Sequence, residues 1–545
     1  MAATRIIPGV QITVVKEVVP PQLAPSGVLG LVGLTEKPLA QVERAASWSR
    51  FIEVCGPGTA YSMPEARQAL ANGVFELAIA AVSPTVAECA KVAIPSADGS
   101  SAGLHLEARA PGPWANNYIV KVTARADNFD LEIRPSAGAS PLEIHRRLTS
   151  AGVADTLQKT STVVQVKFFP KSGDYTLEGG GTDEPSGEAK RAHVVIPSAD
   201  GSSAGLHLAA RVPGSLANGY IVKVTAQDDK FNLEIRPSAG ADPLEVHRNL
   251  TSAGVIDTLQ KVSTVVQVKF SPKSGDYTLA GGTDASVTDY TDALKRLEDE
   301  PDVDLVLAAV QDFSKVDDVI NIYSQVISHC RRMSEDSKGR IGFGQAPPDN
   351  APAQDYVDMA STLFSDRFVL VAPHGVVGAV AGRVGNLTYF QSPTFKQVGG
   401  LATLSCALTI EEQQSLLKGN VVPIINQRGR GIIILRGLTT DGDQISVRRV
   451  ADRAVRGVKM LGELFIGRLN NEDGRGALKQ KLTEFLVQME KDGAIVPSTD
   501  GSDPAFKVDV YSSQADFAQG IVRVDMAVRP VRAIDFIYAT ILVQV

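Results

Sequence analysis

Residues 118–168 alternate between apolar and polar side chains, which is the pattern of strands with one buried face. β-branched residues recur at every second position in Tyr118–Ala124, Phe129–Arg134 and Thr162–Phe168, and Pro, Gly and Ser residues bound these runs. Between them, the apolar spacing of Pro141–Leu148 predicts a short amphipathic helix. This part of the chain is therefore predicted to be rich in β-structure.

The same pattern occurs twice, because the sequence contains an internal duplication. Val92–Glu178 returns, without a gap, as Val194–Ala280, and the two copies differ at 17 of 87 positions. Such similarity indicates a tandem duplication, and we expect each copy to form a compact unit of its own. Two copies are too few for a solenoid, which needs a longer array of stacked repeats.

After the second copy, strand-like and helix-like patterns alternate. Val303–Val310, Arg340–Ala346 and Phe368–Ala372 are apolar runs of strand length, whereas Asp317–Met333 and Ala353–Phe364 have helical periodicity. Strands that alternate with helices predict a parallel sheet covered by helices.

The next segment is predicted to contain a helix and a hairpin. Thr409 and Gln413 have nearly the spacing of a capping box at the start of a helix over Thr409–Leu417. Val421–Ile425 and Gly431–Leu435 flank a basic turn, as the strands of a hairpin would.

Two longer helices follow the hairpin. Ser446 is the candidate N-cap of a helix that runs to about Ile466, and Asp473 is that of a second helix, from about Gly474 to Lys491. Gly493 would end this second helix. Its apolar side chains are spaced as one face: Leu478, Leu482, Phe485, Leu486 and Met489.

Both ends of the chain have the pattern of strands without a partner nearby in the sequence. Strands are predicted at Phe506–Tyr511 and Ile521–Val528, and also at Val10–Val19 and Asp535–Val545. A free apolar strand is an aggregation hazard unless another chain covers it. The apolar positions at the ends alternate with polar ones: Val10, Ile12 and Val14, then Ile537, Ala539, Ile541, Val543 and Val545.

Composition narrows the class of protein. At about 150 residues per domain, the 545 residues predict three or four domains. A net charge of −7 gives no basic field that would favour nucleic acid, and no apolar run reaches 18 residues. The first residues lack a charged and then apolar signal, so we expect a soluble protein made in the cytoplasm. The four scattered cysteines are expected to be reduced thiols.

The sequence offers little chemistry. It contains none of the motifs GxxxxGK[ST], GxGxxG and HExxH, and no Cys or His spacing typical of a metal site. The string GxSxG occurs only inside the duplicated segment, at Gly99–Gly103 and Gly201–Gly205. His374 follows a predicted buried strand, where α/β enzymes often place functional groups, but no nucleophile or carboxylate motif accompanies it. We therefore predict no catalytic residues, no metal and no cofactor.

A basic stripe is the clearest charged feature. Arg449, Arg453, Arg456 and Lys459 recur at helical spacing on the first of the two long helices. The stripe is either a solvated face or a surface that docks onto an acidic partner. Arg475, Lys479 and Lys481 on the second helix form a second candidate surface.

Several segments in combination resemble the sheath proteins of contractile phage tails and related contractile injection systems. They are Pro8-Gly9-Val10 near the start, and Leu279–Glu298, in which Gly281, Gly282, Thr283, Asp284, Asp289, Tyr290, Ala293 and Leu294 fit the family's pattern while Ala285 replaces its usual second glycine. They also include the turn after Val376, Arg428–Thr440, Val447-Arg448-Arg449, Phe465–Ile495 and Gly520–Val545.

This resemblance implies the fold and the domains. The fold class would be an α/β core with a mixed or parallel sheet (the family's subtilisin-like domain), a C-terminal α+β sheath domain and two inserted β-rich repeat domains. The implied boundaries are an N-terminal arm at 1–30, a core segment at 31–91, repeat domains at 92–183 and 194–283, the α/β domain at 284–425, the C-terminal domain at 426–534 and an arm strand at 535–545. The name "subtilisin-like" implies a fold and no activity.

The resemblance also implies a function. The protein would be a structural subunit, not an enzyme, that polymerises as stacked hexameric rings around an inner tail tube and contracts to drive the tube through a target envelope. Neighbouring subunits would interlock through Val10, Ile12, Val14, Ile537, Ile541, Val543 and Val545, and the tube would face Arg449, Arg453, Arg456, Lys459, Arg475 and Lys479.

The implied partners are further copies of the chain, the inner tube protein, and baseplate and tail terminator proteins, without nucleic acid or membrane insertion. The particle would be a phage tail or an injection device that assembles in the bacterial cytoplasm. Two alternatives from other classes are a surface adhesin, whose duplicated units bind carbohydrate, and a degenerate α/β hydrolase. The hydrolase has no nucleophile motif outside the duplicated segment, and the adhesin would need export.

Overall fold

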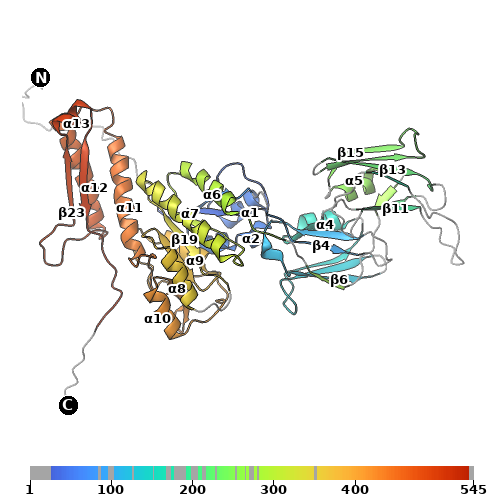
Figure 1. The fold of residues 1–545 in the computed structure, drawn as a ribbon, viewed down its shortest axis with the longest axis horizontal. Helices are drawn as coiled ribbons and strands as arrows, with labels where there is room; N and C mark the ends of the chain where they lie inside the picture. Colours follow the sequence, from blue (N-terminus) through green and yellow to red (C-terminus); the bar gives the residue numbers. More distant parts are fainter. Residues whose placement is uncertain are drawn as a thin grey trace, which may run out of the picture.

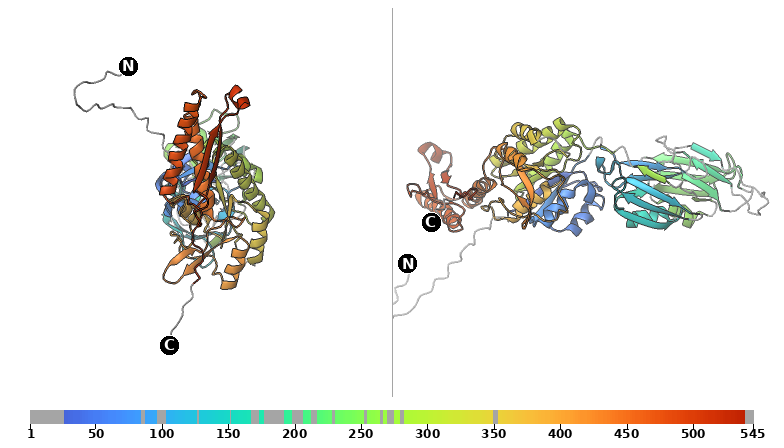
Figure 2. Two further views of the ribbon diagram at one scale, coloured as in Figure 1. Left: turned by 90° about the vertical axis from the view of Figure 1, so that its left-hand side faces the viewer. Right: turned by 90° about the horizontal axis from the view of Figure 1, so that it is seen from below.

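The computed structural model describes residues 26–538, except 84–86, 96–102, 126–127, 151, 167–172, 177–191, 198–205, 212–216, 228–229, 252–253, 264–265, 269–274, 279–281 and 349–352. The described part is elongated (Figure 1). The duplicated segment lies at one end, a large sheet with its helices lies in the middle, and the last helices and strands lie at the other end (Figures 1 and 2). The strand predicted at Val10–Val19 and residues 539–545 lie outside the described residues.

An eight-stranded sheet forms the middle of the molecule, in the order β2-β3-β1-β18-β19-β20-β21-β22. The inner six strands are parallel, and β2 and β22 are antiparallel to their neighbours. The predicted parallel sheet and the predicted hairpin are thus confirmed. The strands are β1 (Val28–Gly33), β2 (Glu43–Ala45), β3 (Glu76–Ala81), β18 (Leu305–Ala308), β19 (Ile341–Gln345), β20 (Phe368–Ala372), β21 (Val422–Gln427) and β22 (Gly431–Ile434).

Helices cover both faces of this sheet, because the strands are apolar on both sides. One core joins the sheet to α6, α7, α8 and α10, and the other joins it to α1, α3 and α9. The helices are α1 (Trp48–Cys55), α2 (Thr59–Ser62), α3 (Pro64–Ala71), α6 (Val287–Arg296), α7 (Val316–Glu335), α8 (Ala353–Thr362), α9 (Val377–Asn386) and α10 (Ile410–Lys418), with a 3-10 turn at Leu297–Asp299. Residues before and after the duplication therefore build one domain.

The two copies of the duplication contain the same strands and the same helix in the same order, and the first copy also has a 3-10 turn. The first has β4 (Lys91–Ile94), β5 (Leu104–Ala108), a 3-10 turn (Pro113–Ala115), β6 (Ile119–Ala124), β7 (Phe129–Arg134), β8 (Glu143–Leu148), α4 (Val153–Thr160), β9 (Val164–Val166) and β10 (Gly173–Thr176). The second has β11 (His193–Ile196), β12 (Leu206–Ala210), β13 (Ile221–Gln227), β14 (Lys230–Arg236), β15 (Glu245–Thr251), α5 (Val255–Val262), β16 (Val266–Val268) and β17 (Gly275–Thr278).

Two of the four sheets in the duplicated segment combine strands from both copies. The three-stranded sheets β4-β5-β9 and β11-β12-β16 each use one copy, but the four-stranded sheets are β17-β6-β7-β8 and β10-β13-β14-β15. The last strand of each copy thus pairs with the other copy, and a single apolar cluster contains buried side chains of both. The expectation that each copy forms a compact unit of its own is wrong in this respect.

The helix predicted at Pro141–Leu148 is wrong, because β8 is an edge strand paired with β7. His145 and Leu148 are buried, and this spacing of three residues resembles one face of a helix. The spacing arises from an irregularity in the register with β7, where Arg147 takes a positive φ of 55°. A bulge of this kind places two successive side chains on the exposed side of a strand.

The last helices and strands pack together at the end of the molecule away from the duplication (Figure 1). They are α11 (Ile445–Glu463), α12 (Glu472–Lys491), β23 (Phe506–Tyr511), α13 (Gln514–Ala518) and β24 (Arg523–Val528). Both long helices and both strands are confirmed, but two caps are wrong, because Gln444 precedes α11 and Asn471 caps α12. The capping box at Thr409 is confirmed, with Glu412 instead of Gln413 as its partner. Cap residues differ from the predictions by one to two positions, which is the usual uncertainty of helix ends.

Candidate interface sites

The carboxyl edge of the parallel sheet holds polar side chains that bind one another. Gly375 donates to Gln345 Oε1 (2.9 Å), and Gln345 donates to Glu65 Oε1 (3.3 Å). Burial raises the pKa of Glu65 to about 7. His374 Nδ1 lies 2.9 Å from the Ala346 carbonyl oxygen. These contacts fit a structural role for His374, and no cluster of potential metal ligands occurs among the described residues.

Asp284 joins the start of α6 to the end of β18. Its Oδ2 accepts from the backbone amides of Gln311 and Asp312 (both 2.9 Å), and the Tyr290 hydroxyl lies 3.0 Å from its Oδ1. Burial raises the pKa of Asp284. Asp289 forms a capping box with Ser286, which begins α6. The part of the motif at 282–294 is therefore an anchor of the fold, because its polar side chains satisfy backbone groups at the sheet edge.

The basic stripe of α11 lies against the central sheet of its own chain. Arg449 is only 5 % exposed, donates to the carbonyls of Val384 (2.7 Å) and Leu387 (3.1 Å), and lies 3.8 Å from Asp304. Burial lowers the pKa of Arg449. Arg456 donates to the carbonyls of Pro301, Val303 and Gly339, Lys459 donates to that of Asp336, and Arg453 stacks over Tyr389.

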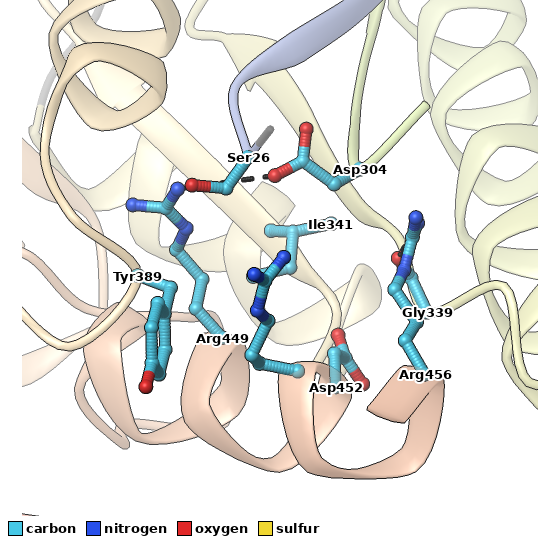
Figure 3. A pocket seen from close by; sticks show the side chains of 9 residues that line it. Ser26, Asp304, Gly339, Ile341, Tyr389, Arg449, Asp452 and Arg456 are labelled. Atoms are coloured by element: carbon cyan, nitrogen blue, oxygen red, sulfur yellow. Dashed lines mark hydrogen bonds and ion pairs between the residues drawn. The ribbon is translucent and has the colours of Figure 1, made fainter. Parts of the chain in front are cut away.

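Asp452 supplies negative charge that balances arginines at the junction between α11 and the central sheet. Its oxygens lie 3.1 Å from both terminal nitrogens of Arg367, and one lies 2.9 Å from Arg448. Gly339 allows the close approach, because a Cβ there would lie 2.4 Å from the Asp452 carboxyl carbon. Figure 3 shows a pocket at this junction, lined also by Ser26, with Arg449 and Arg456 rising from α11. The contacts fix α11 relative to the sheet.

The C-terminal arm leaves the body of the protein at Asp535. Its carboxylate accepts from Arg436 (2.9 Å) and from Gln444 (2.8 Å), and its side chain is 7 % exposed. The residues that follow are unprotected: Phe536 is 64 % exposed, Ile537 84 % and Tyr538 94 %. Asp535 is thus an anchor from which an apolar segment projects into solvent.

The hairpin β23–β24 offers open strand edges. In the part of the chain that the structure describes, the two strands pair only with each other as a regular sheet. A groove beside β24 is lined by Val524 and Met526 of the strand, Val455 and Val458 of α11, and the loop 335–337. A two-stranded sheet is marginal by itself, so added strands would stabilise it.

The second candidate surface lies on α12, on the side of the molecule away from the duplication (Figure 1). Lys479 lies 2.9 Å from Asp509, Lys481 lies 2.8 Å from Glu484, and Arg475 contacts the side chain of Asn470. The side chains of Lys479 and Lys481 are 48 % and 42 % exposed, so both remain accessible.

The structure places some of the predicted residues and leaves others outside its description. Arg449, Arg453, Arg456 and Lys459 lie together at the junction, Arg475 and Lys479 lie on α12, and Ile537 is exposed in the arm. Val10, Ile12, Val14, Ile541, Val543 and Val545 lie outside the described residues. Sequence reasoning missed Asp452 and Asp535. The spacing of Asp452, four residues after Arg448, was the available signal for the former.

The polar clusters described above thus bind groups of this same chain, and the hairpin β23–β24 forms a two-stranded sheet among the described residues. Residues 283–440 match the phage tail sheath protein central domain, and residues 439–544 match the phage tail sheath C-terminal domain. Residues 283–544 therefore carry the central and C-terminal domains of the phage tail sheath family, and the chain is identified by them as a contractile tail sheath protein. These matches give no support to the adhesin alternative.

Solved structures of sheath proteins are also similar to this chain. The sheath tail protein Lin1278 from Listeria innocua is 14 % identical, with a TM-score of 0.46, over 94 % of this chain and 93 % of its own. The contracted helical sheath of the anti-feeding prophage is 17 % identical, with a TM-score of 0.39, over 49 % and 78 %. The contracted PVC sheath complex of an extracellular contractile injection system is 18 % identical, with a TM-score of 0.40, over 48 % and 77 %.

The search of curated proteins found no match. Among the described helices, none has the length and apolar character needed to cross a membrane.

Proposed function

We propose that this chain polymerises head-to-tail around an inner tube and interlocks by giving its terminal strands to neighbouring subunits. The observation that carries the proposal is that one molecule contains both a two-stranded hairpin with open strand edges and a C-terminal arm with exposed apolar side chains. β24 has an open groove at its side, and Phe536–Tyr538 project without cover beyond the anchor at Asp535. Strand addition supplies hydrogen bonds along the open edge and burial for alternate side chains.

In this proposal Val10, Ile12 and Val14 of the N-terminal arm, and Ile537, Ile541, Val543 and Val545 of the C-terminal arm, are the interlocking residues. A contact that uses different surfaces on the two subunits generates an open helical array or a ring. Stacked hexameric rings form if, in each layer, six successive contacts lead back to the first subunit. Baseplate and terminator proteins would bind the two ends of such a stack.

Contraction would move rigid subunits on these arms. The junction at α11 supports this idea, because Arg456 alone donates to three backbone carbonyls of the central domain and Asp452 binds two arginines. A subunit that is stiff inside and flexible at its ends transmits a lattice change as a rotation. The energy that drives the tube would be stored in the extended lattice.

The duplicated segment would be an insertion that points away from the tube. It lies at the opposite end of the molecule from α12 and the hairpin (Figures 1 and 2). The insertion would lie between the core segment 31–91 and the α/β domain 284–425, and the two repeats predicted as domains 92–183 and 194–283 share their four-stranded sheets within it. The C-terminal domain 426–534 would then face the tube. The assembled particle is a phage tail or an injection device built in the bacterial cytoplasm.

The tube-facing charges would belong to this C-terminal domain. Arg475 and Lys479 are the better supported set, because Arg449 and Arg456 already bind groups of their own chain. An exposed ionic contact is modest and salt-sensitive, which suits a tube that must be released. Arg449, Arg453, Arg456 and Lys459 stay a second set.

Reversing the charge of Lys479 and Lys481 to Glu is expected to yield sheaths that mostly lack a tube, when both proteins are produced together. Lys159→Glu is the matched control, because Lys159 is an exposed lysine paired with an aspartate at the other end of the molecule. Its sheaths should keep the tube. Normal tube retention in the Lys479 and Lys481 variant would show that α12 does not hold the tube.

Electron microscopy of the purified full chain tests the proposed function directly. A sheath subunit is expected to form hollow, striated tubes or helical polymers at high concentration. A monodisperse monomer that never polymerises, with or without its tube protein, would contradict the proposal.

A further inference from the structure

The two copies of the duplication exchange their last strands. β10, from the first copy, pairs with β13 of the second copy, with Gly173 opposite Val224 and Thr176 opposite Ile221. β17, from the second copy, pairs with β6 of the first copy, with Gly275 opposite Val122 and Thr278 opposite Ile119. Because corresponding residues of the copies are 102 positions apart, the two pairings have the same register.

Strand pairing by itself does not favour the exchange over a closed arrangement. Both donor strands have the sequence GDYT, and both receiving edges begin with IVKVTA. Each edge therefore offers the same hydrogen bonds and the same neighbours to either strand. The choice between an exchanged and a closed arrangement has to come from the connections of the chain.

The connection to the central sheet favours the exchange. Asn116 of the first copy binds Gly282 with its side chain, through contacts of 2.9 and 3.0 Å, and Glu88 accepts from the backbone amides of Gly112 and Thr283. The chain thus enters and leaves the duplicated segment side by side, at the first copy. Only three residues lie between Thr278 and Gly282, and the four steps from one Cα atom to the next span at most about 14 Å. β17 must therefore lie close to the first copy.

We propose that the duplicated segment is one interlocked unit, in which each copy completes the four-stranded sheet of the other within the same chain. The inner copy holds both chain connections, and the outer copy is attached by two crossings, from β9 to β10 and from β16 to β17. A single apolar cluster spans both copies and supports this unit. Two crossings with paired strands restrict the outer copy more than one flexible linker does, so it keeps its orientation relative to the core. This inference does not depend on the sheath function.

Disulfide trapping in the full chain distinguishes the arrangements. In the exchanged form Asp174 lies opposite Lys223, and Asp276 lies opposite Lys121. In a closed form residue 174 would lie opposite Lys121 instead. Opposite residues of antiparallel strands have Cα atoms about 4.5–5.5 Å apart, which a disulfide can span. The test variant is Asp174→Cys with Lys223→Cys, and the matched control is Asp174→Cys with Lys121→Cys.

After mild oxidation at low protein concentration, the Asp174→Cys, Lys223→Cys variant is expected to form a disulfide within the chain in most molecules, whereas the control stays reduced. Peptide mapping separates the new bond from the four native cysteines. A disulfide in the control alone would show closed copies, and disulfide-linked dimers would show exchange between chains. Absence of a bond in both would show that β10 does not pair as described. Each of these three results overturns the proposal. Asp276→Cys with Lys121→Cys repeats the test at the other junction if the first variant misfolds.

Discussion

Removing residues 536–545 is expected to give a folded subunit that no longer forms long polymers. The cut leaves Asp535 in place, so the contacts with Arg436 and Gln444 that seal the body of the protein remain. What is lost is the segment that begins with Phe536, Ile537 and Tyr538, which are all exposed. The thermal midpoint should therefore change little, because these side chains contribute little burial to the subunit itself.

The loss of assembly should be nearly complete. Burial of one large apolar side chain contributes roughly 1.5–3 kcal/mol, so several of them in a neighbour's groove provide much of the lattice contact. A loss of only 2.8 kcal/mol would weaken each contact about a hundredfold. Circular dichroism measures the folding of the truncated chain, and sedimentation and electron microscopy measure its polymers.

A chain in which residues 536–545 are replaced by ten Gly and Ser residues is the matched control for arm length. It should also fail to polymerise, because the apolar alternation is gone. Removal of residues 1–19 is expected to have the same effect from the other end. If the chains lacking either arm still form ordinary long polymers, the interlocking arms are not the joints of the lattice.

Replacing Asp452 by alanine is expected to lower the free energy of unfolding by about 3–5 kcal/mol, because removing one member of a buried ion pair leaves an uncompensated charge. The side chains of Asp452 and Arg367 are 10 % and 11 % exposed. Arg448 keeps its contact with Asp366, but Arg367 keeps no carboxylate partner among the described contacts. The midpoint of the first transition in urea should fall accordingly.

Two further variants make this measurement specific. Asp366→Ala removes the exposed partner of Arg448 and should cost at most about 1 kcal/mol. Adding Arg367→Met to Asp452→Ala should recover part of the loss, because the unpaired buried charge is removed with it. An Asp452→Ala chain as stable as the original would show that the junction of α11 and the sheet does not depend on this charge cluster.

Sequence periodicity predicted the helices and strands of the central and C-terminal parts well. Phe368–Ala372 and Phe506–Tyr511 have the predicted bounds, and α7 and α12 differ by one or two residues at their ends. These elements are long or strongly apolar, and their burial follows directly from their own side chains. The helix predicted at Pro141–Leu148 failed because a bulge in an edge strand imitates helical spacing, and bulges depend on the partner strand.

The candidate sites depended more on tertiary structure. The sequence shows that Arg449, Arg453 and Arg456 share one helix face, but it cannot show which surface that face meets. Folding brings the face to the amino edge of the sheet, where backbone carbonyls of residues 301, 303 and 339 accept its hydrogen bonds. Every residue has a backbone carbonyl, so the sequence does not show which carbonyls will accept hydrogen bonds from a side chain. From the sequence alone, a basic stripe that binds its own backbone therefore looks the same as one that binds a partner protein.

The sequence by itself determined the duplication, the family and the alternation of strands and helices, because each of these is a pattern along the chain. Only the tertiary structure decided which copy of the duplication completes which sheet. GDYT occurs identically at 173–176 and 275–278, and so do the edges that receive it. With identical strands and edges, local pairing energy cannot discriminate. The short connection from Thr278 to Gly282, fixed beside Asn116, therefore decides the pairing.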